Sequence, residues 1–202
     1  MKSAACILVF MIGLATDLHA QNELIFYAEH IDFSMDGGYF HINGMYTFIN
    51  ATHHSITSGI IYPLPDPDHN IVSANVVDIK NNSAYKYDWA PNGLQFDLVV
   101  KAGDTVELCI SYNQRIKSIN TYILTSTKYW QKPLQIAEYS LTVNKETRIK
   151  SFSYQPDTVD EKTDRDIYYW HKKRFMPRKD LIVEIIDNTI DKSGDKSKEI
   201  AR

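Results

Sequence analysis

Residues 94–115 read LQFDLVVKAGDTVELCISYNQR, and this stretch decides the fold class. Apolar side chains recur at every second position on both sides of a Lys-Ala-Gly-Asp turn. They are Leu94, Phe96, Leu98, Val100, Val106, Leu108, Ile110 and Tyr112. A period of two is typical of a strand that buries one face. The stretch therefore predicts two strands, 94–100 and 105–115, separated by a turn at Gly103.

The same alternation extends outward through most of the chain. Aromatic and β-branched residues dominate, and turn signals recur about every eight to twelve residues, as in a sandwich or barrel. A long first hairpin is expected around Asp36-Gly37-Gly38, and Gly44 in its second strand indicates a bulge or a close backbone approach. Residues 120–127 are expected to form a strand and residues 156–165 a loop. The predicted fold is all-β, a large antiparallel β-sandwich of about ten to twelve strands, built as one unit or as two packed sub-sandwiches.

The first twenty residues are predicted to be a signal peptide. Lys2 precedes an apolar run of ten residues at 6–15, and Ala20 offers a small residue for cleavage. The run is too short for a helix across a bilayer of about 30 Å. We expect a sandwich domain over residues 21–186 and a charged flexible or short helical tail over 187–202. The protein is accordingly expected to be exported, periplasmic or extracellular, and not membrane-spanning after cleavage.

Composition narrows the function classes. The chain has 202 residues, 44% hydrophobic and 23% charged, with a formal net charge of −3. Nucleic-acid-binding domains usually carry clustered basic residues in excess, so no nucleic-acid partner is expected. Cleavage would leave Cys109 as the single cysteine, which predicts no internal disulfide.

Motifs for catalysis are missing from the sequence. No phosphate-binding glycine loop, HExxH, GxSxG or CxxC pattern occurs, so no cofactor and no catalytic residue are predicted. No metal site is assigned either, although four histidines are candidate ligands: His41, His53, His54 and His69. Adjacent His53 and His54 would point to opposite faces of a strand, but they could converge in a loop.

Two loops and a basic strand end are the candidate interaction surfaces. The loops are residues 66–70 and 156–165, and a basic run at 171–174 follows Trp170. The individual candidates are Asp66, Asp68, His69, Trp130, Trp170, Lys172, Lys173 and Arg174. Basic residues beside aromatic ones can also bind polyanions, although here a rim of an interaction surface is the preferred interpretation.

Several segments resemble known β-domains. The segments at 46–52, 62–65 and 96–106, followed by Tyr112, are similar to vault/inter-alpha-trypsin type β-domains. Tyr122-Ile123-Leu124-Thr125, Trp130 and Pro133, together with the Pro-Leu-Pro strand end at 63–65, resemble an exported bacterial all-β family of unknown function. The resemblance implies an all-β periplasmic or secreted protein and transfers no catalytic residue.

We therefore expect a non-enzymatic interaction or accessory domain whose partner is an envelope or extracellular protein. A carbohydrate- or envelope-binding module is the first alternative and requires exposed coplanar aromatic rings. A metal-dependent hydrolase is the second, and requires the histidines to converge with a carboxylate. A carrier of apolar ligands would need a cavity of several hundred cubic ångströms.

Overall fold

The structure, a computed structural model, describes residues 23–66 and 70–186. The predicted signal peptide, the predicted tail, Asp68 and His69 lie outside the described residues. Within the described part the chain forms fourteen strands in three sheets. None of the helices in this part has the length and apolar character needed to cross a membrane.

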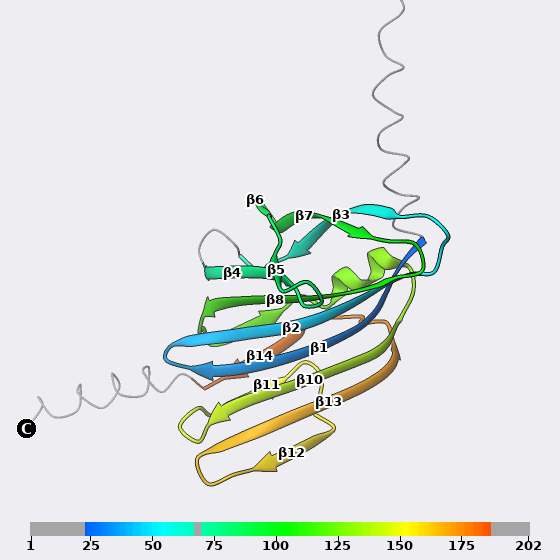
Figure 1. The fold of residues 1–202 in the computed structure, drawn as a ribbon. Coiled ribbons are helices and arrows are strands. Elements are labelled where there is room, and N and C mark those ends of the chain that lie inside the picture. Colours follow the sequence, from blue (N-terminus) through cyan, green and yellow to red (C-terminus); the bar gives the residue numbers. More distant parts are fainter. Residues whose placement is uncertain (1–22, 67–69, 187–202) are drawn as a thin grey trace, which may run out of the picture.

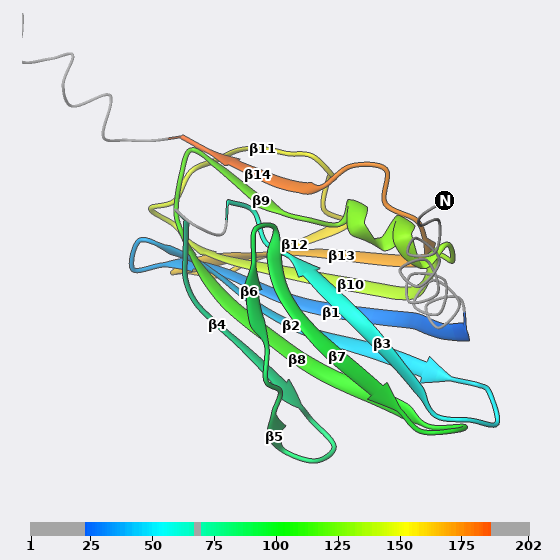
Figure 2. The same cartoon turned by 90° about the horizontal axis from the view of Figure 1, so that it is seen from above.

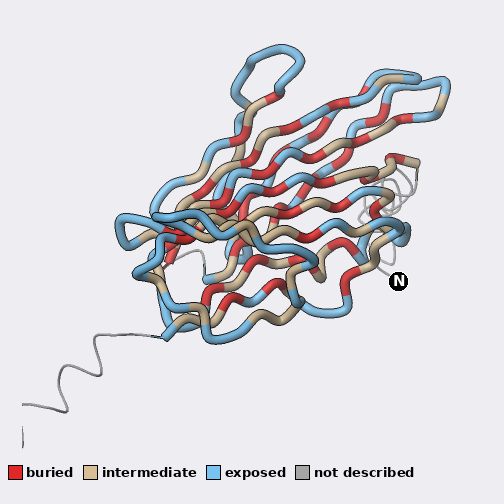
Figure 3. Tube along the Cα trace, turned by 90° about the horizontal axis from the view of Figure 1, so that it is seen from below, coloured by how far each residue is buried: buried red, intermediate tan, exposed pale blue. Residues whose placement is uncertain are grey.

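One layer of the sandwich is a continuous eight-stranded sheet (Figure 1). Its strands, in spatial order, are β12 (Thr158–Glu161), β13 (Arg165–Phe175), β10 (Leu134–Asn144), β1 (Leu24–Asp36), β2 (Tyr39–Asn50), β8 (Thr105–Arg115), β4 (Ile71–Asp78) and β5 (Ser83–Ala84). Figure 3 shows buried residues alternating with less buried ones along the central strands β10, β1, β2 and β8, as expected of a sheet with one face on the core.

The opposite layer is divided into two small sheets (Figure 2). One contains β11 (Ile149–Phe152), β14 (Leu181–Ile185) and β9 (Ile119–Tyr122), and the other contains β3 (Ile56–Pro63), β7 (Gly93–Val100) and β6 (Asp88–Ala90). A 3-10 helix, η1 (Thr125–Trp130), follows β9. The sandwich is thus one unit with a divided second layer, and it is not two separate sub-sandwiches.

The stretch at 94–115 forms the two predicted strands, but they belong to different layers. β7 lies in the β3-β7-β6 sheet and β8 lies in the large sheet. The turn at Gly103, which has a φ of 65°, therefore carries the chain across the sandwich. All eight alternating apolar side chains are buried, so the two strands fill one core from opposite sides.

The first hairpin is confirmed, with Asp36 opposite Tyr39 across a two-glycine turn. β1 pairs on its other side with β10, and this pair is parallel. All the other strand pairs in the described residues are antiparallel. The sandwich prediction therefore holds, with one parallel pair that joins segments more than 100 residues apart.

Two local predictions differ from the structure. Residues 120–127 do not continue as one strand, because β9 ends at Tyr122 and η1 begins at Thr125. The Asp180 carboxylate accepts hydrogen bonds from the backbone N–H groups of Leu124 and Thr125, which turns the chain at this point. Within the predicted loop at 156–165, four residues form β12 and pair with β13.

Candidate functional site: an aromatic cavity between the layers

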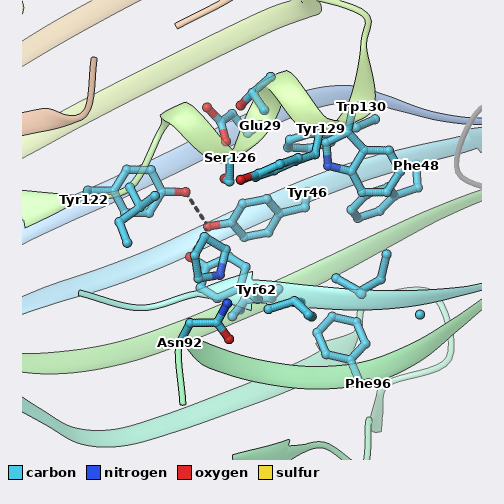
Figure 4. Close-up of a pocket in the computed structure, with 18 residues that line it drawn as sticks. Glu29, Tyr46, Phe48, Tyr62, Asn92, Phe96, Tyr122, Ser126, Tyr129 and Trp130 are labelled. Carbon is cyan, nitrogen blue, oxygen red and sulfur yellow. Dashed lines mark hydrogen bonds between the residues drawn. The ribbon is translucent and has the colours of Figure 1, made fainter. Parts of the chain in front are cut away.

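A cavity of about 360 Å³ lies where β1 and β2 of the large sheet face β3, β9 and η1 (Figure 4). Most of its wall is aromatic or aliphatic. The lining includes Phe26, Glu29, Tyr46, Phe48, Tyr62, Tyr122, Ser126, Tyr129 and Trp130. Ligand sites in proteins are commonly concave, largely apolar, about 300–1,000 Å³ in volume and equipped with a few polar groups.

Three tyrosine hydroxyls meet at one end of the cavity. The Tyr46 hydroxyl, from β2, is 2.6 Å from the Tyr62 hydroxyl and 2.8 Å from the Tyr122 hydroxyl. Tyr62 comes from β3 and Tyr122 from β9, so this hydrogen-bonded group connects the large sheet to both small sheets. Burial raises the pKa of all three phenols well above the usual value, which keeps them protonated as donors and acceptors.

Among the described lining residues, Glu29 provides the single carboxyl group. Its side chain is 4% exposed, and the Tyr139 hydroxyl donates to its Oε1. Burial raises its pKa from 4.5 to about 7, opposed in part by the hydrogen bond from Tyr139. Among the described lining residues there is no lysine, arginine or histidine to neutralise it. The carboxyl group therefore keeps its proton to a higher pH than an exposed glutamate does.

A β-bulge explains why Glu29 faces the core. The pairing of β1 with β2 shifts register between Phe26 and Ala28. Residues with even numbers are buried before this point, whereas Glu29, Ile31 and Phe33 are buried after it. A bulge inserts one extra residue and reverses the face of the side chains that follow it. Glu29 thereby pairs with Tyr46, and both side chains enter the cavity.

Helix η1 forms one wall of the cavity. Trp130 packs against Phe26 and Phe48, with ring centroids 5.6 and 5.3 Å apart, and these two phenylalanines stack on each other at 5.1 Å. Figure 4 shows Tyr129 and Ser126 of the same helix on this side of the cavity. Tyr129 is 68% exposed, so it lies at the opening to solvent.

The Tyr46 ring needs the glycine at position 44. A Cβ placed on Gly44 would lie 2.3 Å from the Tyr46 hydroxyl oxygen and 2.6 Å from two ring carbons. The predicted irregularity at Gly44 is thus a close approach by a side chain, with no bulge at that residue.

Gly44→Ala should lower the free energy of unfolding by about 1–3 kcal/mol, because the buried Tyr46 ring has to move against close-packed neighbours. Urea unfolding followed by circular dichroism measures the change. Gly59→Ala is the matched control, since its Cβ would meet only an Asp97 oxygen, at 3.9 Å. Equal stability of the two variants would contradict the packing described for Tyr46.

The candidate histidines do not converge in the described residues. His41, near the start of β2, lies 2.7 Å from Asn113 and 3.0 Å from Asp36. His54 follows the far end of β2 and contacts Glu23, and His53 is exposed beside it. The described residues contain no group of three or more histidine, cysteine or carboxylate side chains that could hold a metal ion. His69 lies outside them.

The interaction candidates are dispersed over the fold. Asp66 pairs with Lys117 at 3.2 Å, and Lys172 pairs with Asp157 at 2.7 Å. Lys173 and Arg174 are exposed near the end of β13. Trp170 is fully buried, and its indole N–H donates to the Tyr154 carbonyl at 2.9 Å. This placement removes Trp170 from the predicted interaction surface, whereas Trp130 lines the cavity.

Among the described residues, no flat aromatic platform of the kind expected for a carbohydrate-binding module forms around the exposed tryptophan, Trp89. Trp89 is 54% exposed, but its nearest aromatic neighbour, Tyr87, is inclined to it at 78°. The aromatic side chains gather mainly inside, around the cavity.

Sequence reasoning missed Glu29 and the tyrosine group. A signal for Glu29 was present in the sequence. Glu29 is followed at every second position by an apolar residue, namely Ile31, Phe33 and Met35, so it was expected on the same face of the strand as these three. Tyr46, Tyr62 and Tyr122 carry no such signal, because residues 16 and 76 positions apart meet only through the tertiary fold.

Comparisons with known proteins agree with this fold. A crystal structure from Legionella pneumophila, described as a "putative nutrient binding protein", superposes with a TM-score of 0.65 at 17% identity. The match covers 82% of this chain and 68% of that one, and at this identity it shows a shared fold alone.

Weaker matches include an M1 zinc metallopeptidase from Deinococcus radiodurans, at 12% identity and a TM-score of 0.48. This chain covers 42% of that peptidase chain, and the match spans 80% of this one. A comparison with curated proteins found no match. A family model described as a domain of unknown function (DUF4424) matches residues 107–184, from β8 to β14. Over these residues, fewer than half of the chain, the protein is similar to a family whose function is itself unknown.

Proposed function

We propose that this protein is an exported, non-enzymatic binding domain that holds a small organic molecule in the aromatic cavity. The observation that carries the proposal is the cavity itself. Its volume of about 360 Å³ is in the range of known ligand sites, and its polar groups are confined to Glu29 and a few hydroxyl and amide groups. A few polar groups among aromatic walls orient a ligand, while the apolar surface supplies most of the binding free energy.

Export is proposed from the sequence, because residues 1–20 have the charged start and short apolar run of a signal peptide. The similarly folded Legionella pneumophila protein is described as a "putative nutrient binding protein", which agrees with a binding role. The partner expected from the sequence, an envelope or extracellular protein, stays a prediction.

Ligand-observed NMR with benzyl alcohol as the probe tests the proposal. The wild-type protein should bind the probe. Ser126→Phe should weaken binding at least about tenfold, because the new ring occupies cavity volume that the probe needs. Lys128→Phe is the matched control, since it adds the same ring to an exposed position of η1 outside the cavity lining.

Two results would overturn the proposal. One is an absence of probe binding up to the solubility limit of benzyl alcohol. The other is equal binding by wild type, Ser126→Phe and Lys128→Phe, which would place the bound probe elsewhere on the protein.

A further inference from the structure

The charge of the cavity wall restricts the class of ligand. Glu29 is the only acidic or basic residue among the described lining residues, and burial keeps Tyr46, Tyr62 and Tyr122 protonated. An anionic ligand would place a second negative charge in a buried space with no cation to pair with it. Such an arrangement is costly, because charges are weakly screened inside a protein.

One oxygen of Glu29 is available for a ligand. Tyr139 donates to Oε1, and no hydrogen bond from a described residue to Oε2 accompanies this one. Glu29 is only 4% exposed, yet it lines the cavity. A buried carboxylate can be satisfied by a positive group that enters the cavity.

Aromatic rings line the same cavity as this carboxyl group. Phe26, Phe48 and Trp130 pack together, and the rings of Tyr46 and Tyr62 are nearly perpendicular to each other, at 81°. The negative face of an aromatic ring attracts cations, and rings at different inclinations around one volume form the type of cage that binds alkylated ammonium groups.

We propose that the ligand carries an alkylated ammonium group, which lies against the aromatic rings with Glu29 as its counter-charge. This inference rests on the proposed binding function and narrows it to organic cations. The ionised carboxylate is the binding form, so affinity for a quaternary ammonium ion should rise as the pH passes through the pKa of Glu29, about 7.

The other titratable groups near Glu29 do not change charge in this range. They are Tyr46 of β2, Tyr62 of β3, Tyr112 of β8, Tyr122 of β9 and Tyr139 of β10, and burial raises the pKa of every one of them well above the usual value. Tyr129 of η1 also lines the opening. A pH dependence centred near 7 would therefore belong to Glu29.

Calorimetric titration with choline and with 3,3-dimethyl-1-butanol tests the inference. The two probes have the same shape and differ by a positive nitrogen in place of a carbon atom. At pH 8 choline should bind at least about tenfold more tightly than the alcohol, from the cation–π contacts and the counter-charge together. At pH 5.5 the preference should fall severalfold, while affinity for the alcohol stays constant.

Variants separate the two contributions. Glu29→Gln keeps the side-chain shape and an acceptor for Tyr139, and it should remove the pH dependence. Trp130→Leu should weaken binding of choline more than binding of the alcohol. Glu107→Gln is the matched control, because Glu107 is an exposed carboxylate on the outer face of β8.

The outcomes distinguish the two proposals. Equal affinities for choline and the alcohol, with benzyl alcohol still bound, would overturn the organic-cation inference and leave the binding function standing. A choline preference that persists unchanged in Glu29→Gln would also overturn it, because this variant lacks the negative charge that the inference assigns to Glu29. Failure of all three probes would overturn the proposed function as well.

Discussion

Trp170→Ala should lower the free energy of unfolding by about 3–5 kcal/mol, the range found when large buried aromatic residues are truncated. The Trp170 side chain is fully buried, and the Phe152 ring lies edge-on to it with centroids 5.4 Å apart. Truncation leaves a cavity and also removes the donor to the Tyr154 carbonyl. Equilibrium unfolding in urea or guanidinium chloride, followed by circular dichroism, measures the loss.

Trp89→Ala is the control for that experiment. Trp89 is 54% exposed on β6, so its removal should change stability by less than about 1 kcal/mol. If the two variants unfolded at the same denaturant concentration, the placement of Trp170 in the core would be contradicted.

The free energy of unfolding should fall by about 3 kcal/mol as the pH rises from 4.5 to above 7, because of Glu29 alone. The pKa of Glu29 is raised from 4.5 to about 7 in the folded state. Between these values the folded protein holds a proton that the unfolded chain has already released. Raising the pH therefore favours unfolding, and the stabilisation is fully present only below the unfolded pKa.

Glu29→Gln should remove most of this slope, because glutamine does not ionise. Unfolding free energies measured at pH 5, 6, 7 and 8 test the prediction, with Glu107→Gln as the control that keeps the slope. The carboxylates whose pKa is lowered by ion pairs, such as Asp104 and Asp157, lose their stabilising effect only as the pH falls below about 4. A wild-type curve that is flat from pH 5 to 8 would disprove the buried position of Glu29.

The sandwich could be predicted from residues 94–115 and the repeated turn signals, because one-sided burial of a strand requires a period of two. The hairpin at Gly37-Gly38 was predictable for a similarly local reason. The break at residues 123–124 was not, since it depends on the Asp180 carboxylate, which is 55 positions or more away in the sequence. The division of the second layer also depends on long-range pairing.

The cavity was decided by the tertiary structure. The bulge between Phe26 and Ala28 determines which face Glu29 occupies, and alternation in one strand cannot locate an extra residue in its pairing. Tyr46, Tyr62 and Tyr122 come from three sheets. Local residue pattern thus determined the strands and the fold class. The site was decided only when distant strands packed together, because burial, hydrogen bonding and pKa depend on neighbours that the sequence does not place side by side.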